Sequence, residues 1–235
     1  MKKNKVLSVV IPVYNEEKTL SILVKRVQEV KIKGIKKQIV IVNDASTDDS
    51  EKVIESLSRK YKNVLFFKHK KNMGKGAAVR TGFKNATGDF IIIQDGDLEY
   101  DPNEFNLLLS PILKGKAKVV YGSRVLGKIK GFNIPSHYYG NLFLSFVTRL
   151  LYHRRITDME TCYKMMVSEV VKSLNLKSDK FDIEPEITAK LIKKGYIIME
   201  VPITYNSRSF KEGKKITWKD GLKALYVLFK YWIFD

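Results

Sequence analysis

The stretch IIIQDGDLEYDP, from Ile91 to Pro102, joins a strongly apolar run to a strongly acidic one. Three consecutive isoleucines are followed within eight residues by four carboxylates, which are Asp95, Asp97, Glu99 and Asp101. Gly96 separates the first two acids and permits a sharp turn. Either the carboxylates share a cation or they form a solvated loop, and the surrounding sequence has to decide between the two.

Short apolar runs like the one before Asp95 recur through the first half of the chain and alternate with segments of helical spacing. Runs that are apolar on both faces, separated by amphipathic helices, predict an α/β fold with a mostly parallel central sheet and helices on both faces. The five predicted strands cover residues 6–11, 38–43, 63–67, 89–94 and 117–123. Ligands of such sheets bind beyond the carboxyl ends of the strands, so the loops after these runs are the candidate site.

The second half is less regular, and it carries helical patterns over 137–152, 184–195 and 216–234. A loop entering a strand covers 157–167, and one or two strands cover 196–205. We expect residues 1–235 to form a single domain with three parts. Residues 1–121 form the first part, 122–210 form the second, and 211–235 form a C-terminal amphipathic helix.

The net charge of +18, from 43 basic and 25 acidic residues, suggests an anionic partner unless it only reflects a lysine-rich proteome. The chain has no basic-aromatic repeat and no recognised reading module, which argues against nucleic acid. Cys162 is the only cysteine, so the chain forms no internal disulfide, which fits a reducing compartment. The first apolar run is broken by Pro12 and Asn15 and is interpreted as a strand rather than a signal peptide. No run reaches the roughly 20 apolar residues of a spanning helix.

Three of the loops after predicted strands carry groups suited to a nucleotide. Pro12 ends the first run, and Tyr14 can lie flat against a ring. Asp44 ends the second run and can accept hydrogen bonds from a ribose or a base. Gly74 and Gly76 open a predicted helix and permit close backbone approach, and helix N-termini bind phosphate. Each signal taken alone is also compatible with ordinary turn chemistry.

The acidic loop fits a hard cation. Mg²⁺ and Mn²⁺ take oxygen ligands, and Mg²⁺ usually binds through one or two carboxylates together with substrate phosphates. Asp95 and Asp97 come directly after a buried strand, where the sheet delivers them to the ligand crevice. This position favours a cation site over a solvated loop.

The motifs VVIPVYNEEKTL, IVNDASTDDS, NMGKGAAVRTGF and GDFIIIQDGDLEYDP, in this order, resemble those of family 2 glycosyltransferases. VVYGSR, TDMETCYKMM, FDIEPEITAK and VPITYNSR extend the likeness over nearly the whole chain, which is similar to dolichyl- or polyprenyl-phosphate mannose or glucose synthases. The resemblance implies the nucleotide-sugar-binding glycosyltransferase A-type fold, with residues 1–121 as the nucleotide-sugar-binding half and 122–210 as the acceptor half. It also implies a bound Mg²⁺ or Mn²⁺ and inverting transfer of a hexose from a nucleoside-diphosphate sugar.

The resemblance also assigns donor-side roles to individual residues. The predicted nucleotide-sugar-binding residues are Pro12, Tyr14, Glu16, Asp44, Lys75 and Asp95. The predicted metal ligands are Asp95, Asp97 and Glu99, although relatives often carry glutamine at the position of Glu99.

Mechanism separates two acceptor classes. A hydroxyl acceptor needs a general base, whereas a lipid monophosphate is already largely ionised, with a second pKa of about 6, and needs cations instead. By resemblance, Arg124, Arg208 and Lys214 are the predicted acceptor-phosphate ligands, and Asp97, Arg124 and Asp158 are the predicted catalytic residues. Transfer to a sugar hydroxyl of a cell-surface glycan remains the alternative, with Asp158 or Glu160 as base. GFNIPSHYYGN lacks the arginines that the synthases carry there and offers only His137 and Asn141.

The C-terminal segment WKDGLKALYVLFKYWIFD places Leu222, Leu225, Phe229 and Trp232 on one helical face, with lysines near its borders. Such a face suits either packing on the domain's own core or binding in the headgroup layer of a membrane. We expect peripheral binding to an anionic membrane surface, from the cytoplasmic side.

Overall fold

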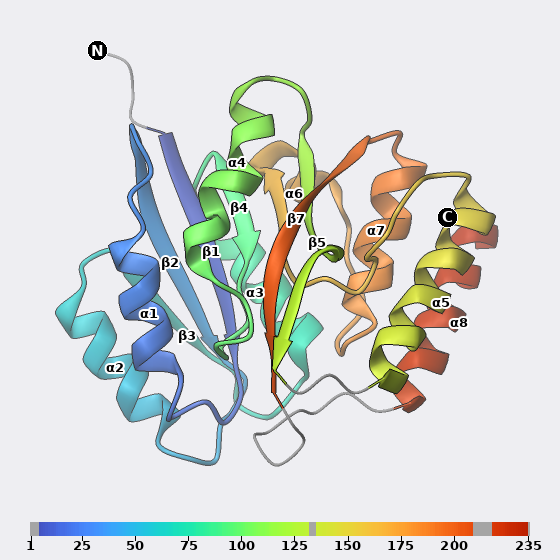
Figure 1. Ribbon diagram of the computed structural model, residues 1–235. Coiled ribbons are helices and arrows are strands. Elements are labelled where there is room, and N and C mark those ends of the chain that lie inside the picture. The colour runs from blue at the N-terminus through green and yellow to red at the C-terminus, as the bar shows by residue number, and fades with distance from the viewer. Residues whose placement is uncertain (1–4, 132–134, 209–217, 235) are drawn as a thin grey trace.

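The computed structural model describes residues 5–131, 135–208 and 218–234, and it confirms a mixed α/β fold built on one seven-stranded sheet (Figure 1). The strand order is β3-β2-β1-β4-β6-β5-β7. β6 runs antiparallel to both of its neighbours, and every other pair is parallel. The prediction of a mostly parallel sheet with helices on both faces is therefore confirmed.

The first half of the sheet consists of four parallel strands, each followed by a helix. The strands are β1 (Lys5–Val13), β2 (Ile35–Asn43), β3 (Val64–Lys68) and β4 (Phe90–Ile93). The helices are α1 (Leu20–Glu29), α2 (Ser50–Lys60), α3 (Lys75–Asn85), and the short η1 (Pro102–Glu104) that leads into α4 (Phe105–Leu113). The centres of β1, β2 and β4 are fully buried because helices cover both faces, which explains their continuous apolar runs.

β5 (Val119–Gly131) is longer than the predicted run 117–123 and pairs in parallel with β7 (Ile198–Ser207). The register shifts between Ser123 and Lys128, and there the two backbones approach so closely that a Cβ on Gly127 would overlap the carbonyl oxygen of Ile203. The short β6 (Lys164–Val167) lies between β4 and β5 and joins the two halves into one sheet, and α6 (Ser168–Ser173) follows it.

Three helices, α5 (Pro135–Tyr152), α7 (Ile183–Lys193) and α8 (Trp218–Phe234), pack together around a second apolar cluster. Figure 1 shows α5 and α8 side by side at the edge of the molecule. The Tyr152 hydroxyl donates to the Leu228 carbonyl oxygen at 2.7 Å and ties the two helices together. The buried face of α8 consists of Ala224, Val227, Leu228 and Tyr231.

Within the three described ranges, no helix combines the length and the apolar character that crossing a bilayer requires. Lys214 and Lys215 lie outside these ranges.

Candidate active site

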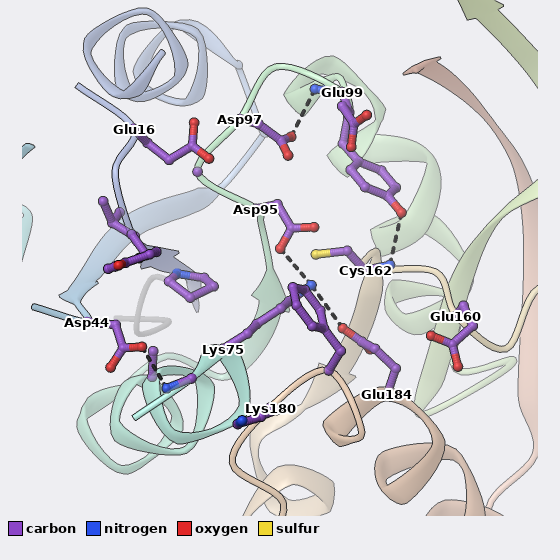
Figure 2. Close-up of a pocket in the computed structure, with 18 of the residues that line it drawn as sticks. Glu16, Asp44, Lys75, Asp95, Asp97, Glu99, Glu160, Cys162, Lys180 and Glu184 are labelled. Atoms are coloured by element: carbon purple, nitrogen blue, oxygen red, sulfur yellow. Dashed lines mark hydrogen bonds and ion pairs between the residues drawn. The ribbon is translucent and has the colours of Figure 1, made fainter. Parts of the chain in front are cut away.

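A cleft of about 450 Å³ opens at the carboxyl ends of β1, β2 and β4 and receives side chains from both halves of the chain (Figure 2). Most of the predicted site residues line it, namely Pro12, Tyr14, Glu16, Asp44, Lys75, Asp95, Asp97, Glu99, Arg124 and Arg208. Asp158 does not line the cleft but lies beneath Arg124. Lys214 lies outside the described residues, so its place relative to the cleft is left open.

Asp44 fixes the loop that leads into α3. Its carboxylate accepts the backbone N–H of Met73 at 2.9 Å and of Gly74 at 2.7 Å, and it lies 2.7 Å from Nδ1 of His69. Gly74 has φ +100°, and a Cβ there would overlap the carbonyl oxygen of Asp179. This loop therefore requires glycine, and Asp44 holds it against the wall of the cleft.

Asp95 belongs to a chain of buried ion pairs. Lys75 Nζ lies 2.7 Å from Asp95 and 3.1 Å from Glu184, and Glu184 also pairs with the fully buried Lys164 at 2.5 Å. Burial alone would raise the pKa of Asp95, but the neighbouring Lys75 ammonium holds that pKa below its ordinary value. Asp95 therefore stays ionised at neutral pH.

Asp97 experiences the opposite balance. Burial, followed by the negative charges of Asp95 and Glu99, raises the pKa of Asp97 to about 8, even though Arg208 lies 2.9 Å away. Arg208 also contacts Glu16 at 3.3 Å. The surroundings of Asp97 therefore supply too little positive charge to keep its carboxyl group ionised at neutral pH.

The other two acids of the opening stretch have different surroundings. Glu99 accepts the Tyr205 hydroxyl at 2.7 Å and the backbone N–H of Arg208 at 2.8 Å, so both of its oxygens contact the end of β7. Asp101 caps η1 by accepting the backbone N–H of Asn103 at 3.0 Å.

The acidic pair fits a divalent cation by its chemistry. Asp95 and Asp97 supply hard oxygen donors, and the pKa of Asp97 is raised first by burial and then by the charges of Asp95 and Glu99, which a cation would offset. Within the described ranges, no group of three or more His, Cys, Asp or Glu side chains is arranged to hold a metal. A Mg²⁺-type site with two carboxylates would therefore need the donor phosphates to complete it.

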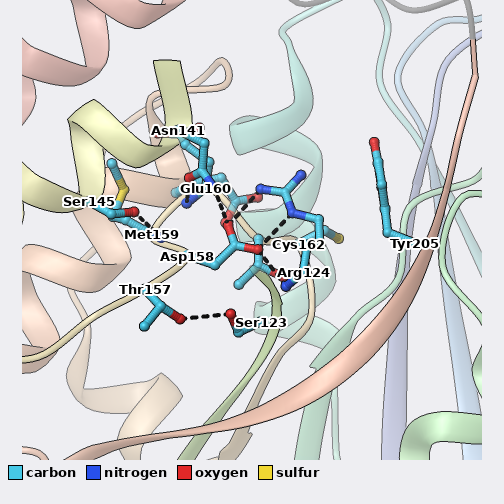
Figure 3. Close-up of polar contacts among 12 residues, drawn as sticks. Ser123, Arg124, Asn141, Ser145, Thr157, Asp158, Met159, Glu160, Cys162 and Tyr205 are labelled. Atoms are coloured by element: carbon cyan, nitrogen blue, oxygen red, sulfur yellow. Dashed lines mark hydrogen bonds and ion pairs between the residues drawn. The ribbon is translucent and has the colours of Figure 1, made fainter. Parts of the chain in front are cut away.

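Arg124 is held rigidly over the other side of the cleft (Figure 3). Its Nε and backbone N–H both donate to Oδ2 of Asp158, at 2.7 and 2.8 Å, and Nη2 donates to Oδ1 at 2.7 Å. Its guanidinium lies 5.1 Å from the centre of the Tyr205 ring. Burial works against the charge of Asp158, but the Arg124 pair holds the pKa of Asp158 below its ordinary value. These contacts suit Asp158 to positioning Arg124 rather than to accepting a proton.

Sequence reasoning missed several residues of the site, namely Tyr100, Cys162, Lys164, Glu184 and Tyr205. Lys164 begins the otherwise apolar strand KMMV, and a lysine at such a position is a sequence pattern that could have indicated a buried ion pair. Burial raises the pKa of the Cys162 thiol, which therefore remains a thiol beside Asp95. No local pattern marks Cys162 or the tyrosines, because their partners come from distant segments.

The model of the family described as glycosyl transferase family 2 matches residues 8–174. The chain is 33% identical over 233 residues to the dolichol-phosphate mannosyltransferase of Pyrococcus furiosus, covering 96% of this chain and 64% of that enzyme. It is 29% identical over 245 residues to the UDP-N-acetylglucosamine–dolichyl-phosphate N-acetylglucosaminyltransferase of Methanococcus voltae, covering 96% of this chain and 95% of that enzyme.

The fold matches that of glucosyl-3-phosphoglycerate synthase from Mycobacterium tuberculosis, solved in complex with Mn²⁺, UDP and phosphoglyceric acid. The TM-score is 0.72 at 17% identity, over 98% of this chain and 80% of that chain.

Proposed function

The chain belongs to glycosyl transferase family 2, and we propose that it moves a hexose from a nucleoside-diphosphate sugar to a polyprenyl or dolichyl phosphate. The observation that carries this proposal is one cleft that contains both an acidic pair, of which Asp97 is buried, and two arginines. The acidic pair suits a metal-bound diphosphate, and the arginines suit a second, separate phosphate. The printed names of the Pyrococcus and Methanococcus relatives support a dolichyl phosphate acceptor.

The reaction is a direct displacement at the anomeric carbon. An oxygen of the acceptor phosphate forms a bond to that carbon while the bond to the leaving diphosphate breaks, so the configuration inverts. The acceptor is already ionised near neutral pH, and no residue has to remove a proton from it. Arg124 and Arg208 offset its negative charge and orient it, with Lys214 as a further predicted ligand.

The leaving nucleoside diphosphate gains negative charge as the bond breaks. A Mg²⁺ or Mn²⁺ ion bound by Asp95 and Asp97 would supply Lewis-acid stabilisation. Glu99, the third predicted ligand, instead has both carboxylate oxygens hydrogen-bonded at the end of β7. Lys75, held beside Asp95, adds a positive charge at the same place. Pro12, Tyr14, Glu16 and Asp44 form the wall that we assign to the base and ribose.

The acceptor lipid places the enzyme at a bilayer surface, and α5 and α8 present a matching face. Each helix exposes a single row of large apolar side chains on the side away from the second apolar cluster. These rows are Tyr139, Phe143, Phe146 and Leu150 on α5, and Trp218, Leu222, Tyr226, Phe229 and Ile233 on α8, and α8 also exposes Trp232 and Phe234 beside its row. Aromatic residues beside lysines, on a chain of net charge +18, suit an anionic headgroup layer, which we assign to the cytoplasmic side.

The experiment that tests the activity is transfer from UDP-glucose, UDP-N-acetylglucosamine and GDP-mannose, with and without a polyprenyl phosphate. We expect one donor to yield a lipid-linked sugar only when the lipid phosphate is present. Transfer to an oligosaccharide hydroxyl, without use of the lipid phosphate, would instead support the alternative acceptor. The partly buried Glu160 is the observation that favours that alternative, because burial raises its pKa to about 7, a value suited to a general base.

A further inference from the structure

Glu160 lies in a loop whose backbone is held at almost every residue (Figure 3). The N–H groups of Thr157 and Asp158 donate to Glu200, and that of Met159 donates to Ser145 Oγ at 3.0 Å. The Glu160 N–H itself donates to Asn141 Oδ1 at 3.3 Å. The loop therefore presents the Glu160 side chain from a fixed position in the cleft wall.

The carboxylate of Glu160 has no hydrogen-bond or ion-pair partner among the described residues, and its Oε1 is fully buried. Two cations are within electrostatic reach, but both are engaged elsewhere. Arg124 is bound by Asp158 through three hydrogen bonds, and Lys164 is bound by Glu184 and two carbonyl oxygens. A buried acceptor without a partner costs stability, so such a group points to a ligand that supplies the missing donor.

The order of the strands places Glu160 relative to the donor. Asp44 follows β2, Asp95 follows β4, and Glu160 shortly precedes β6, which lies beside β4. Because β6 is antiparallel to β4, its amino-terminal end meets the carboxyl end of β4 at the cleft. Figure 2 accordingly shows Asp95 between Asp44 and Glu160. A donor with its base near Asp44 and its diphosphate at Asp95 thus extends its sugar toward Glu160.

We propose that Glu160 accepts a hydrogen bond from a hydroxyl group of the sugar being transferred, and so helps to select that sugar. This inference rests on the proposed function, because it requires a nucleoside-diphosphate sugar in the cleft. The hydroxyl supplies a hydrogen-bond donor to the Glu160 carboxylate, which lines the cleft and receives no such donor from the described residues. A hydrogen bond to a charged group in such a site is worth about 10- to 100-fold in affinity.

The test compares the wild type with Glu160→Ala and Glu160→Gln, using the donor that the transfer assay identifies. Donor analogues lacking one sugar hydroxyl at a time form the second arm. Binding of UDP or GDP alone is measured beside binding of the intact sugar nucleotide. Glu169→Ala is the matched control, because Glu169 is exposed on α6, where it pairs with Lys118.

We expect Glu160→Ala to lower the affinity for the intact sugar nucleotide by about 10-fold or more, while leaving the affinity for UDP or GDP unchanged. One deoxy analogue should bind the wild type more weakly than the parent donor does, by about the same factor. The Glu160→Ala variant should bind that analogue and the parent donor about equally. Glu160→Gln, whose amide oxygen still accepts, should recover part of the loss and also guards against a folding defect in the alanine variant.

Two outcomes overturn the inference alone. In the first, each deoxy analogue loses the same factor in affinity, relative to the parent donor, in the wild type and in the variants. In the second, turnover is lost with all donors while donor affinity is unchanged, which would make Glu160 a base for the acceptor. The proposed function itself fails, and the inference with it, if the wild type transfers no sugar and binds every sugar nucleotide no more tightly than UDP or GDP alone.

Discussion

At the scale of single residues, the carboxyl groups of the acidic loop differ in the partners that surround them. Asp95 pairs with Lys75 and Cys162, and Glu99 bonds Tyr205, whereas Asp97 pairs with Arg208 but is buried beside two other carboxylates. Negative charge that the free protein tolerates poorly is typical of a site that binds a cation.

The raised pKa of Asp97 predicts a stability difference with a definite sign. In the folded protein this carboxyl stays protonated up to about pH 8, whereas its unfolded pKa is near 3.8. The folded state therefore holds the extra proton between these values, and its stability falls as the pH rises from about 4 to about 8. We expect Asp97→Asn, without divalent ion, to be more stable than wild type at pH 8 by at least about 1 kcal/mol, or about 2–4 °C in Tm.

Thermal unfolding of both proteins at pH 5 and pH 8 measures this difference, which should shrink at the lower pH. An equal difference in Tm at pH 5 and pH 8 would contradict the raised pKa of Asp97.

Asp97→Asn should also lose transfer, and chelation of the wild type should stop transfer until Mg²⁺ or Mn²⁺ is restored. Near-native turnover of the variant would refute the metal role of Asp97.

The Arg124–Asp158 pair predicts a defect confined to the acceptor. Arg124→Lys keeps a positive charge but loses the forked contact with Asp158, so the cation no longer has a fixed position. We expect the KM for polyprenyl phosphate to rise about 10-fold or more, with the donor KM little changed. Asp158→Asn should behave similarly, because the Asp158 carboxylate accepts three hydrogen bonds from Arg124. An equal loss of donor affinity would instead place Arg124 on the donor diphosphate.

At the scale of elements, α8 has two faces with different roles. Ala224, Val227, Leu228 and Tyr231 pack on α5 and α7, while Tyr226, 63% exposed, and its neighbours point outward. Packing on the domain's own core is therefore confirmed for one face of α8, and binding in the headgroup layer stays a prediction for the other. Leu225, which the sequence placed on the membrane face, is partly buried against the second cluster.

The outward faces of α5 and α8 predict binding to vesicles. We expect the wild type to float with anionic vesicles at low salt, and to be released by high salt because its lysines contribute electrostatically. The double variant Phe143→Ser, Tyr226→Ser should lose at least about tenfold in membrane partitioning, since each aromatic side chain loses about 1.5–3 kcal/mol of burial. Ile22→Ser on α1 is the control, because Ile22 is also exposed but distant in the fold. Failure of the wild type to float, or equal binding of the double variant, would contradict the docking face.

At the scale of the whole molecule, the chain of ion pairs from Asp95 through Lys75 and Glu184 to Lys164 joins the two halves. Lys75 and Asp95 come from the first half, and Lys164 and Glu184 come from β6 and α7 in the second. The cleft keeps its shape only if both halves stay together, so this network contributes to the site as well as to stability.

Glu184→Gln should destabilise the protein strongly, because it leaves the fully buried Lys164 ammonium without its carboxylate partner, whereas Lys75 keeps Asp95. Breaking a buried pair in this way costs about 3–5 kcal/mol. Glu169→Gln, which breaks an exposed pair with Lys118, should cost at most about 1 kcal/mol. Urea unfolding of both variants measures the contrast, and similar midpoints for the two would contradict the proposed role of the network.

The sequence by itself determined the elements of the first half and the edge at which the site forms. Ile91–Ile93 and the equivalent runs are apolar on both faces because helices bury both sides of the sheet, and this burial leaves a local signature. Asp44, Asp95 and Asp97 could be placed in one cleft because parallel strands bring their carboxyl ends to one edge. The ordered motifs identified the family.

Only the tertiary structure decided which charges meet. Strand order inserts β6 between β4 and β5, and this insertion sets Lys164 and Glu184 beside Lys75. Arg208 reaches Asp97 from the far end of the chain, while Glu160 is left without a partner among the described residues. Whether a carboxylate is paired depends on neighbours more than a hundred residues away as well as on nearby ones, and local sequence patterns carry no record of those distant contacts.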